Sequence, residues 1–460
     1  MSKKNKRKKH QQAVNFDVLE QIQPNAAGID IGAEEIYVCV PPGRDEERIR
    51  VFTTFTSDLH RLASWLVTCG VKTVAMESTG IYWIPLFDIL EGVGLTVCLV
   101  NARHLKNVSG RKTDVIDCEW LYQLHTYGLL RGSFHPPDEI RPLRALARHR
   151  DMLVKYRAAH IQHMQKALEL MNLKLTYVLS DITGVTGMTI IRAILAGEHD
   201  PHHLAQYRDA KCKHDEAQIA AALTGNYRHE HLFALRQAVE LYEMYGQQLV
   251  AVDAEMDGLY DQMRPPDDRQ LTTTPPKPTH QKRRKNQANF DLTTALYRLT
   301  GVDLTQIDGI QALTAQTVIT EVGFDMSQWP SEKHFTSWLG LCPNNQITGG
   351  KVKNRRTKKT DNRAAAALRI AAQSLARSKS ALGAFYRRIK SRHGAAKAIV
   401  ATAHKLARII YHMLRHRVDY IDPGADHYDE QQRQRAIKRL HKQAAKLGFQ
   451  IEALPVVQHA

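Results

Sequence analysis

The sequence predicts three folded parts: an α/β domain at the N-terminus, a long helical middle segment and a mainly helical C-terminal domain. Three observations lead to this prediction. Short apolar runs alternate with helical spacing over residues 26–135, leucines and methionines recur every three or four residues over 140–265, and a second helix-rich stretch covers 291–420. The length of 460 residues fits about three domains.

Changes in composition divide the chain further. The predicted segments are a basic tail (1–24), the α/β domain (25–138), a helical coiled-coil arm (139–265), a Pro-, Thr- and Lys/Arg-rich flexible linker (266–290), the C-terminal domain (291–421) and a tail with a polar helix (422–460). The basic tail suits phosphate contact and equally suits a role in solubility.

The elements of the α/β domain follow from apolar runs and breaker residues. Strands are expected at 27–40 (with a tight turn at 33–35), 48–54, 71–76 and 95–100, and helices at 59–69, 85–91 and 113–124. Strands that alternate with helices predict a sheet flanked by helices.

The arm is predicted from two apolar stripes. The first runs from Leu146 to Met171, and the second runs from Leu232 to Met263 with Gly246 and Asp253 as interruptions. This spacing is typical of a long helical hairpin or a coiled coil. The sequence leaves open whether the helices pair within one chain or across a dimer.

Charge and composition exclude several classes of protein. Lys and Arg number 64 and Asp and Glu 47, which gives a formal net charge of +17. This charge predicts a polyanionic partner, first of all nucleic acid. A ribosome-associated or membrane-surface protein can carry the same charge. Apolar residues make up 43%, which excludes a wholly disordered chain, and no apolar run is long enough for a transmembrane helix. Six cysteines without a CxxC pair argue against a zinc finger or disulfide scaffold and indicate a reducing cytosol.

Two carboxylates are expected at strand ends. Asp30 stands in the run GIDIG, where alternation places the two isoleucines on one face of the sheet and Asp30 on the other. Glu77 ends the strand at 71–76 and precedes small residues, a position where α/β sheets present ligand groups.

Two further carboxylates share a helical face, because Asp114 and Asp117 are three residues apart. Mg²⁺ prefers hard oxygen ligands, and two ions about 3.5–4 Å apart clamp the attacking and leaving oxygens of a phosphodiester. We therefore favour a metal site formed by all four acids. Each acid also has a structural explanation: Asp30 in a tight turn, Glu77 at a surface strand end, Asp114 as a helix cap and Asp117 in the first turn.

A basic glycine loop marks the C-terminal domain. Thr348 precedes Gly349, Gly350 and Lys351, and glycines let a backbone approach a phosphate closely. The other cations expected to contact nucleic acid are Lys353, Arg355, Arg356, Lys358 and Lys359. The Thr348 hydroxyl is a nucleophile only when a base or metal activates it; in the alternative, the loop grips phosphate and Thr348 only donates a hydrogen bond.

Taken in order, these motifs resemble those of a known family, the DEDD transposases of the one-ten family of bacterial insertion sequences, described as bridge-RNA-guided recombinases. The stretches that carry the resemblance are GIDIG (28–32), MESTGIYW (76–83), KTDVID (112–117), WLGLCP (338–343), ITGGK (347–351) and NRAAAALR (362–369).

The resemblance implies a RuvC-like, RNase H-type first domain with Asp30, Glu77, Asp114 and Asp117 as its metal-binding tetrad and two Mg²⁺ ions as cofactor. It implies an enzyme that cuts and rejoins donor and target DNA, guided by a structured RNA that the element encodes. The arm would serve assembly of a dimer or tetramer. The implied location is the bacterial cytoplasm at the nucleoid, without a membrane partner.

The resemblance also implies a covalent protein–DNA intermediate on a serine hydroxyl, and the motif places that hydroxyl at Thr348. Threonine here replaces serine, and its methyl group crowds an in-line attack. Two other functions remain compatible with the sequence. A RuvC-like nuclease would hydrolyse branched DNA with a metal-activated water and would tolerate Thr348→Ala, and a non-catalytic nucleic-acid-binding scaffold would tolerate Asp30→Asn.

Overall fold

The computed structural model describes residues 20–78, 80–101, 114–263, 273–276, 285–354, 356–358 and 360–452, with backbone only at 114–116 and 346. The chain separates into two compact units, Met1–His135 and Pro136–Ala460, called here the first and second units. Most of the predicted basic tail, together with Arg355 and Lys359, lies outside the described residues.

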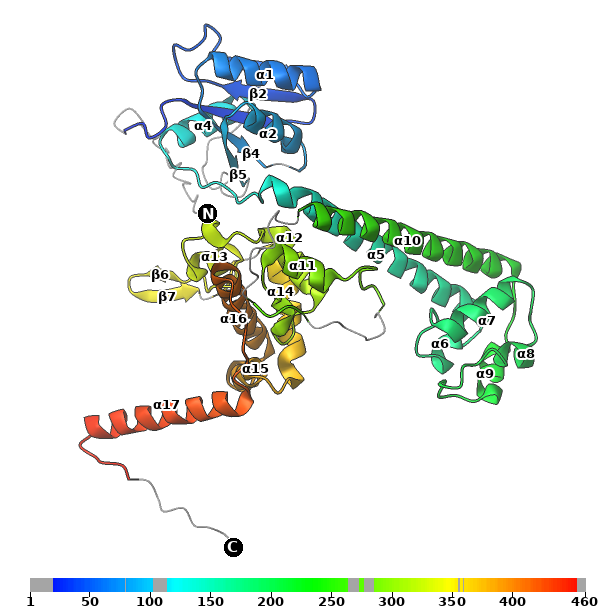
Figure 1. Cartoon of the computed structure of the whole chain (residues 1–460). Helices are drawn as coiled ribbons and strands as arrows, with labels where there is room; N and C mark the ends of the chain where they lie inside the picture. The colour runs from blue at the N-terminus through cyan, green and yellow to red at the C-terminus, as the bar shows by residue number, and fades with distance from the viewer. Residues whose placement is uncertain are drawn as a thin grey trace, which may run out of the picture. The chain divides into compact units, whose positions relative to one another are not determined.

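The first unit contains a five-stranded mixed sheet (Figure 1). Its strands, in spatial order, are β3 (Ile49–Thr53), β2 (Glu35–Cys39), β1 (Ala26–Ile31), β4 (Thr73–Glu77) and β5 (Thr96–Val100). β1 to β3 pair antiparallel, whereas β4 runs parallel to both β1 and β5. The predicted α/β fold is confirmed, and this arrangement agrees with the implied RNase H-type sheet.

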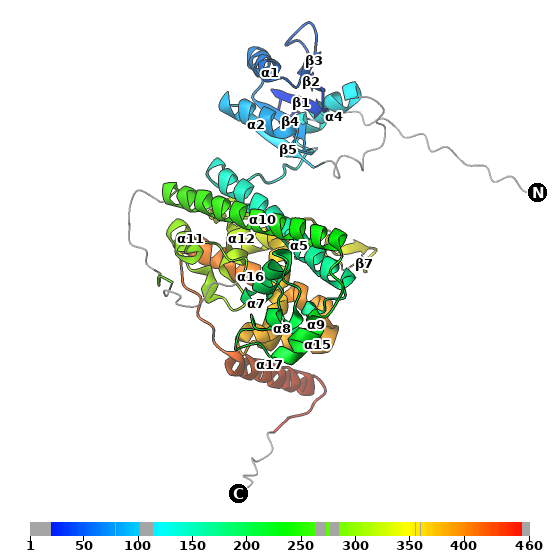
Figure 2. The same cartoon turned by 90° about the vertical axis from the view of Figure 1, so that its right-hand side faces the viewer.

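Helices cover both faces of the sheet (Figure 2). On one face, α1 (Thr56–Thr68) and α2 (Trp83–Gly92) pack on an apolar core that includes Ile29 and Ile31 of β1. On the other face, α4 (Asp114–Thr126) packs on β1, β2 and β4. The alternation in β1 thus places its isoleucines in the larger core, as the sequence predicts.

The second unit begins with a helical hairpin in which α5 (Arg141–Leu170) and α10 (His229–Gln262) run side by side (Figure 1). The two predicted apolar stripes therefore pair within one chain. Between them lie four short helices, α6 (Leu175–Val178), α7 (Val185–Leu195), α8 (Pro201–Ala205) and α9 (Glu216–Leu223). These helices share a buried core with the adjoining ends of α5 and α10.

Asp253 does not interrupt the α10 stripe, contrary to the sequence interpretation. Its side chain is 1% exposed and accepts hydrogen bonds from the Arg150 guanidinium of α5, at 2.5 Å from Nε and 3.3 Å from Nη2. Because a buried carboxylate is stable only when it is paired and hydrogen-bonded, this ion pair completes the contact between the two helices.

The remainder of the second unit is mainly helical, as predicted. Its helices are α11 (Leu292–Thr300), α12 (Ala312–Val322), α13 (Glu332–Trp338), α14 (Arg363–Ser374), α15 (Ala381–His393), α16 (Ala395–His416) and α17 (Ala425–Lys446). The apolar face of α16 packs on α13, α14 and α15, so α16 is the central helix of this core. Among the described residues, the short hairpin of β6 (Gln346–Thr348) and β7 (Lys351–Asn354) departs from the helical pattern.

The described residues of the predicted flexible linker, 273–276 and 285–290, include several that form hydrogen bonds with the folded core. The Thr273 hydroxyl is buried and donates to the Gly301 carbonyl oxygen at 2.6 Å, and Thr274 donates to the Asp419 carboxylate. Asn289 donates its backbone N–H to Asp253 at 3.0 Å. Composition alone does not reveal such hydrogen bonds to residues far away in the sequence.

None of the described helices combines the length and the apolar character that crossing a membrane requires.

Candidate active site

Asp30 and Glu77 occupy adjacent positions on neighbouring parallel strands. The register pairs Ile29 of β1 with Met76 of β4, so the next residue of each strand carries a carboxylate at its C-terminal end. Paired strands lie about 4.8 Å apart. The two carboxylates therefore leave the sheet side by side, at the edge where α/β proteins bind ligands.

Both carboxylates belong to the face of the sheet that α4 covers. Asp30 stands two residues after Gly28 on β1. Gly28 lies directly against α4, because a Cβ built on it would be 2.2 Å from the Cys118 carbonyl oxygen. Glu77 follows Ala75 at the same spacing, and Ala75 packs against Leu121 of α4. Because side chains two residues apart on a strand share a face, Asp30 and Glu77 point to the α4 side.

The first turn of α4 supplies the other two acids. The helix begins at Asp114, so Asp114 and Asp117 are one turn apart on it; the Asp114 side chain lies outside the described residues. Burial raises the pKa of the neighbouring Cys118 thiol to about 12, and the negative charges of Cys39 and Asp30 add to that rise. Asp30 is therefore within electrostatic range of this turn, where the helix dipole favours carboxylates.

The donor set fits a divalent cation. Asp30, Glu77 and Asp117 are half-buried, and their oxygens are the hard ligands that Mg²⁺ prefers. Within the described ranges, no three His, Cys, Asp or Glu side chains form a ready metal site. Asp30, Glu77 and Asp117, whose side chains are all described, therefore do not converge into a metal-binding cluster, and the Asp114 side chain lies outside the described residues.

Thr348 lies in the second unit, at the end of a β-hairpin. Gly349 and Gly350 both have positive φ angles, 55° and 73°, as a two-residue type I′ turn requires. The predicted phosphate-gripping loop is therefore, in this structure, the turn of a β-hairpin. Thr348 pairs directly with Lys351, and both side chains are exposed.

The hairpin has two different faces. Thr348 and Lys351 share one face, whereas Ile347 and Val352, which are 62% and 38% exposed, pair on the other. A register shift between Gln346 and Ile347 makes Lys353 the additional residue of a bulge. The described cations that follow, Arg356 and Lys358, are also exposed. A hydroxyl and several ammonium or guanidinium groups are thus open to a polyanion.

Sequence reasoning missed the role of Gly28. Its backbone touches the α4 backbone, because the Cβ of any other residue would also lie 2.3 Å from the Tyr122 nitrogen. The signal was a glycine inside a strand, which often marks close backbone approach. Gly28 sets the distance between the strand that carries Asp30 and the helix that carries Asp114 and Asp117.

Comparison with known protein families gives two matches. The family model of the IS110 DEDD type, described as "Transposase", matches residues 27–173. A second model, described as "Transposase IS116/IS110/IS902 family", matches residues 303–387. Together they cover just over half of the chain; the first contains all four acids and the second contains Thr348. No curated protein matches the chain.

Proposed function

Because the chain belongs to the IS110 family of DEDD transposases and is thus a DNA transposase, we propose that it cuts and rejoins DNA strands through a covalent intermediate. The observation that carries this proposal is the adjacent placement of Asp30 and Glu77 on β1 and β4, facing the helix that begins at Asp114.

The four acids act as ligands of divalent cations in this proposal. Asp30 and Glu77 come from neighbouring strands of the sheet, and Asp114 and Asp117 from one turn of α4. Their side chains would have to converge when the ions bind. Bound Mg²⁺, two ions by the family resemblance, would supply Lewis-acid stabilisation of charge on the phosphodiester oxygens.

The Thr348 hydroxyl is the proposed nucleophile. Its oxygen forms a bond to phosphorus and loses its proton, while one bond from phosphorus to a deoxyribose oxygen breaks and that oxygen takes up a proton. Rejoining reverses these changes with a new strand. The exposure of Thr348 supports this role, and Lys351 beside it can neutralise the phosphate. The carboxylates and Thr348 belong to different units, so the reaction requires them to meet on the DNA.

RNA guidance and oligomeric assembly complete the proposal. A net charge of +17 suits polyanionic partners, which in this proposal are the DNA and a structured guide RNA. Base pairing would then select donor and target DNA, so the protein needs contacts with backbones more than with base edges. The α5–α10 hairpin is the proposed assembly arm of a dimer or tetramer.

A trapping experiment tests the covalent step. The protein, its co-purified RNA and labelled donor DNA are mixed with Mg²⁺ and separated on a denaturing gel. We expect a protein–DNA adduct with the unchanged protein and with Thr348→Ser, which keeps the hydroxyl, and none with Thr348→Ala. Continued cleavage by Thr348→Ala without an adduct would instead support hydrolysis by water.

A second experiment tests the carboxylates. Asp117→Asn should reduce strand exchange at least about a hundredfold, because metal sites are sensitive to the loss of ligand charge. The matched control is Glu119→Gln, two residues along α4, which loses only a half-exposed pair with Arg48. Removal of divalent cations with EDTA should stop strand exchange, and Mg²⁺ should restore it. Equal effects of the two substitutions, with unchanged folding, would contradict the metal role.

A further inference from the structure

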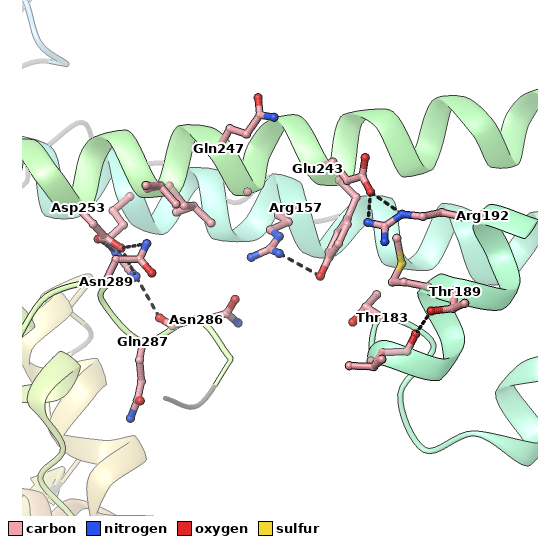
Figure 3. Close-up of a pocket in the computed structure, with 18 residues that line it drawn as sticks. Arg157, Thr183, Thr189, Arg192, Glu243, Gln247, Asp253, Asn286, Gln287 and Asn289 are labelled. Carbon is pink, nitrogen blue, oxygen red and sulfur yellow. Dashed lines mark hydrogen bonds and ion pairs between the residues drawn. The ribbon is translucent and has the colours of Figure 1, made fainter. Parts of the chain in front are cut away.

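A large cavity lies in the second unit, apart from every residue discussed as catalytic. Its volume is about 800 Å³, it is open to one side, and it is lined by residues of α5, α7 and α10 and of 286–289 (Figure 3). In the close-up, the side chains of Arg157, Asn286 and Thr183 surround its open space, whereas Gln247 points away. A cavity of this size is within the range of small-molecule and cofactor sites.

The charges of the lining leave one cation uncompensated. Arg150 is paired with Asp253, and Arg192 with Glu243 at 2.5 Å. Arg157 forms no ion pair among the described residues; its Nη2 donates to the Tyr242 hydroxyl at 3.0 Å, and its buried Nε has no hydrogen-bond partner. A buried or half-buried guanidinium without an acid is costly, so this site favours an anionic ligand.

The Arg157 guanidinium is held flat in one orientation. It lies over the Tyr242 ring, 4.3 Å from the ring centre, and the ring limits its movement. Gly246, one turn further along α10, lies against the guanidinium, because a Cβ built there would be in van der Waals contact with Nη2 at 3.5 Å, and both residues line the cavity. A planar cation with free space next to it is a platform on which an aromatic base can stack.

We propose that this cavity binds one unpaired nucleotide of a nucleic-acid strand. The base would stack on Arg157 and contact the apolar side chains of Val185, Met188 and Val250, and Asn286 would offer donors and acceptors to the base edge. The uncompensated charge of Arg157 would attract the phosphate. The proposal rests on the proposed function only in taking nucleic acid as the partner; it needs no strand exchange.

Other ligands match the lining less well. A single inorganic phosphate would leave most of the 800 Å³ empty and the apolar side chains exposed. A purely apolar ligand would bury the Arg157 charge further without compensation. A nucleotide combines an anion with a flat aromatic ring. Its phosphate would be attracted by the Arg157 charge, and its base would contact the apolar side chains of the cavity.

Binding measurements test the proposal on the full-length chain, purified free of RNA. The probe is a fluorescently labelled ten-nucleotide single-stranded RNA of uridines, followed by fluorescence anisotropy. We expect Arg157→Ala to weaken binding about tenfold, the loss of one stacked base. The matched control, Lys155→Ala, removes one positive charge from an exposed position of the same helix and should weaken binding less than about twofold.

A blocking variant tests the cavity without a change of charge. Gly246→Leu would fill the space beside Arg157 and should weaken binding to a similar degree, and a leucine favours the helix over a glycine. Its control is Gly258→Leu on the same helix, where a Cβ would meet nothing within 4 Å. If Gly246→Leu and Gly258→Leu bind equally well, the cavity is not the site and the proposal fails.

Crosslinking locates the nucleotide and identifies its source. Irradiation with RNA that contains 4-thiouridine should label peptides from 183–192 or 242–250, and Arg157→Ala should abolish this label. Competition by free UMP at concentrations similar to the RNA would mean that the cavity takes a mononucleotide, which would overturn the strand assignment. The Thr348→Ala protein should crosslink normally, so failure of the proposed chemistry and failure of this inference are distinguishable.

Discussion

A buried histidine gives the first unit a specific dependence on pH. His125 of α4 is 4% exposed, and its Nε2 lies 2.9 Å from the Thr73 hydroxyl of β4. Burial lowers the pKa of His125 from 6.5 to about 4. As the pH falls, the unfolded chain therefore takes up a proton before the folded chain does. The stability that neutral His125 contributes is complete above the unfolded pKa and is lost between about pH 6.5 and pH 4.

We expect the α4 region to lose about 2 kcal/mol of stability between pH 7 and pH 5 from this residue alone. Hydrogen exchange of the α4 amides at the two pH values measures it. His125→Gln should remove most of the difference, whereas His60→Gln, an exposed residue of α1, should leave it unchanged. The same pH dependence in both variants would rule out His125 as its cause.

For single residues, the sequence predicted the side of an element that a side chain occupies better than the distant residues that it contacts. The run GIDIG indicated which side of the strand Asp30 occupies, because alternation alone decides it. Asp253 was taken for an interruption because its partner, Arg150, stands 103 positions away. The same limit applies to Arg157, whose lack of an acid partner is visible only when the neighbouring helices are in place.

The β6–β7 hairpin allows a prediction at the scale of elements. Gly349→Asn should preserve the turn and strand exchange, because asparagine tolerates positive φ, whereas Gly349→Val should disrupt the turn and reduce strand exchange. The rate of strand exchange measures both effects. If Gly349→Asn is as inactive as Gly349→Val, glycine is needed for close approach to a phosphate and not for the turn.

The elements of the first unit were predictable because its apolar runs, bounded by breaker residues, match the strands and helices of an α/β domain. The strand at 71–76 and its following helix are present with small shifts, as β4 and α2. The hairpin was not predictable, because strands of only three and four residues are too short to show a usable alternation. Two glycines in a basic stretch fit a phosphate loop and a tight turn equally well.

A cluster of charges joins the parts of the second unit. Glu321 of α12 is buried and accepts hydrogen bonds from Arg144 and Arg148 of α5, and Arg363 of α14 approaches it at 3.3 Å. Burial alone would raise the pKa of Glu321, but the hydrogen bonds and charges of Arg148 and Arg144 outweigh it and lower the pKa below 4.5. The ionised carboxylate therefore stabilises the unit above the unfolded pKa, and this contribution is lost as the pH falls through the folded pKa.

We expect Glu321→Gln to destabilise the second unit by about 3–5 kcal/mol, because it leaves guanidinium groups around a neutral amide. Urea unfolding followed by the fluorescence of Trp329 and Trp338 measures this change. Glu332→Gln, which breaks the more exposed pair with Arg408, should cost less than about 1 kcal/mol. Similar losses in the two variants would show that the cluster adds nothing beyond a surface ion pair.

At the scale of the whole molecule, the sequence predicted which segments are helical but not how they join. The pairing of α5 with α10 was left open, since identical stripes serve contacts within and between chains. Nothing near Glu321 in the sequence indicates that three arginines from two other helices converge on it. Such long-range contacts are set by packing, which a local pattern does not encode.

The contact at Gly28 has a consequence for how the transposase tolerates change. Strand β1 and helix α4 meet there through main-chain atoms, so no side chain lies between them to adjust. One added methyl group at this position would push the helix outward and separate Asp30 from Asp117.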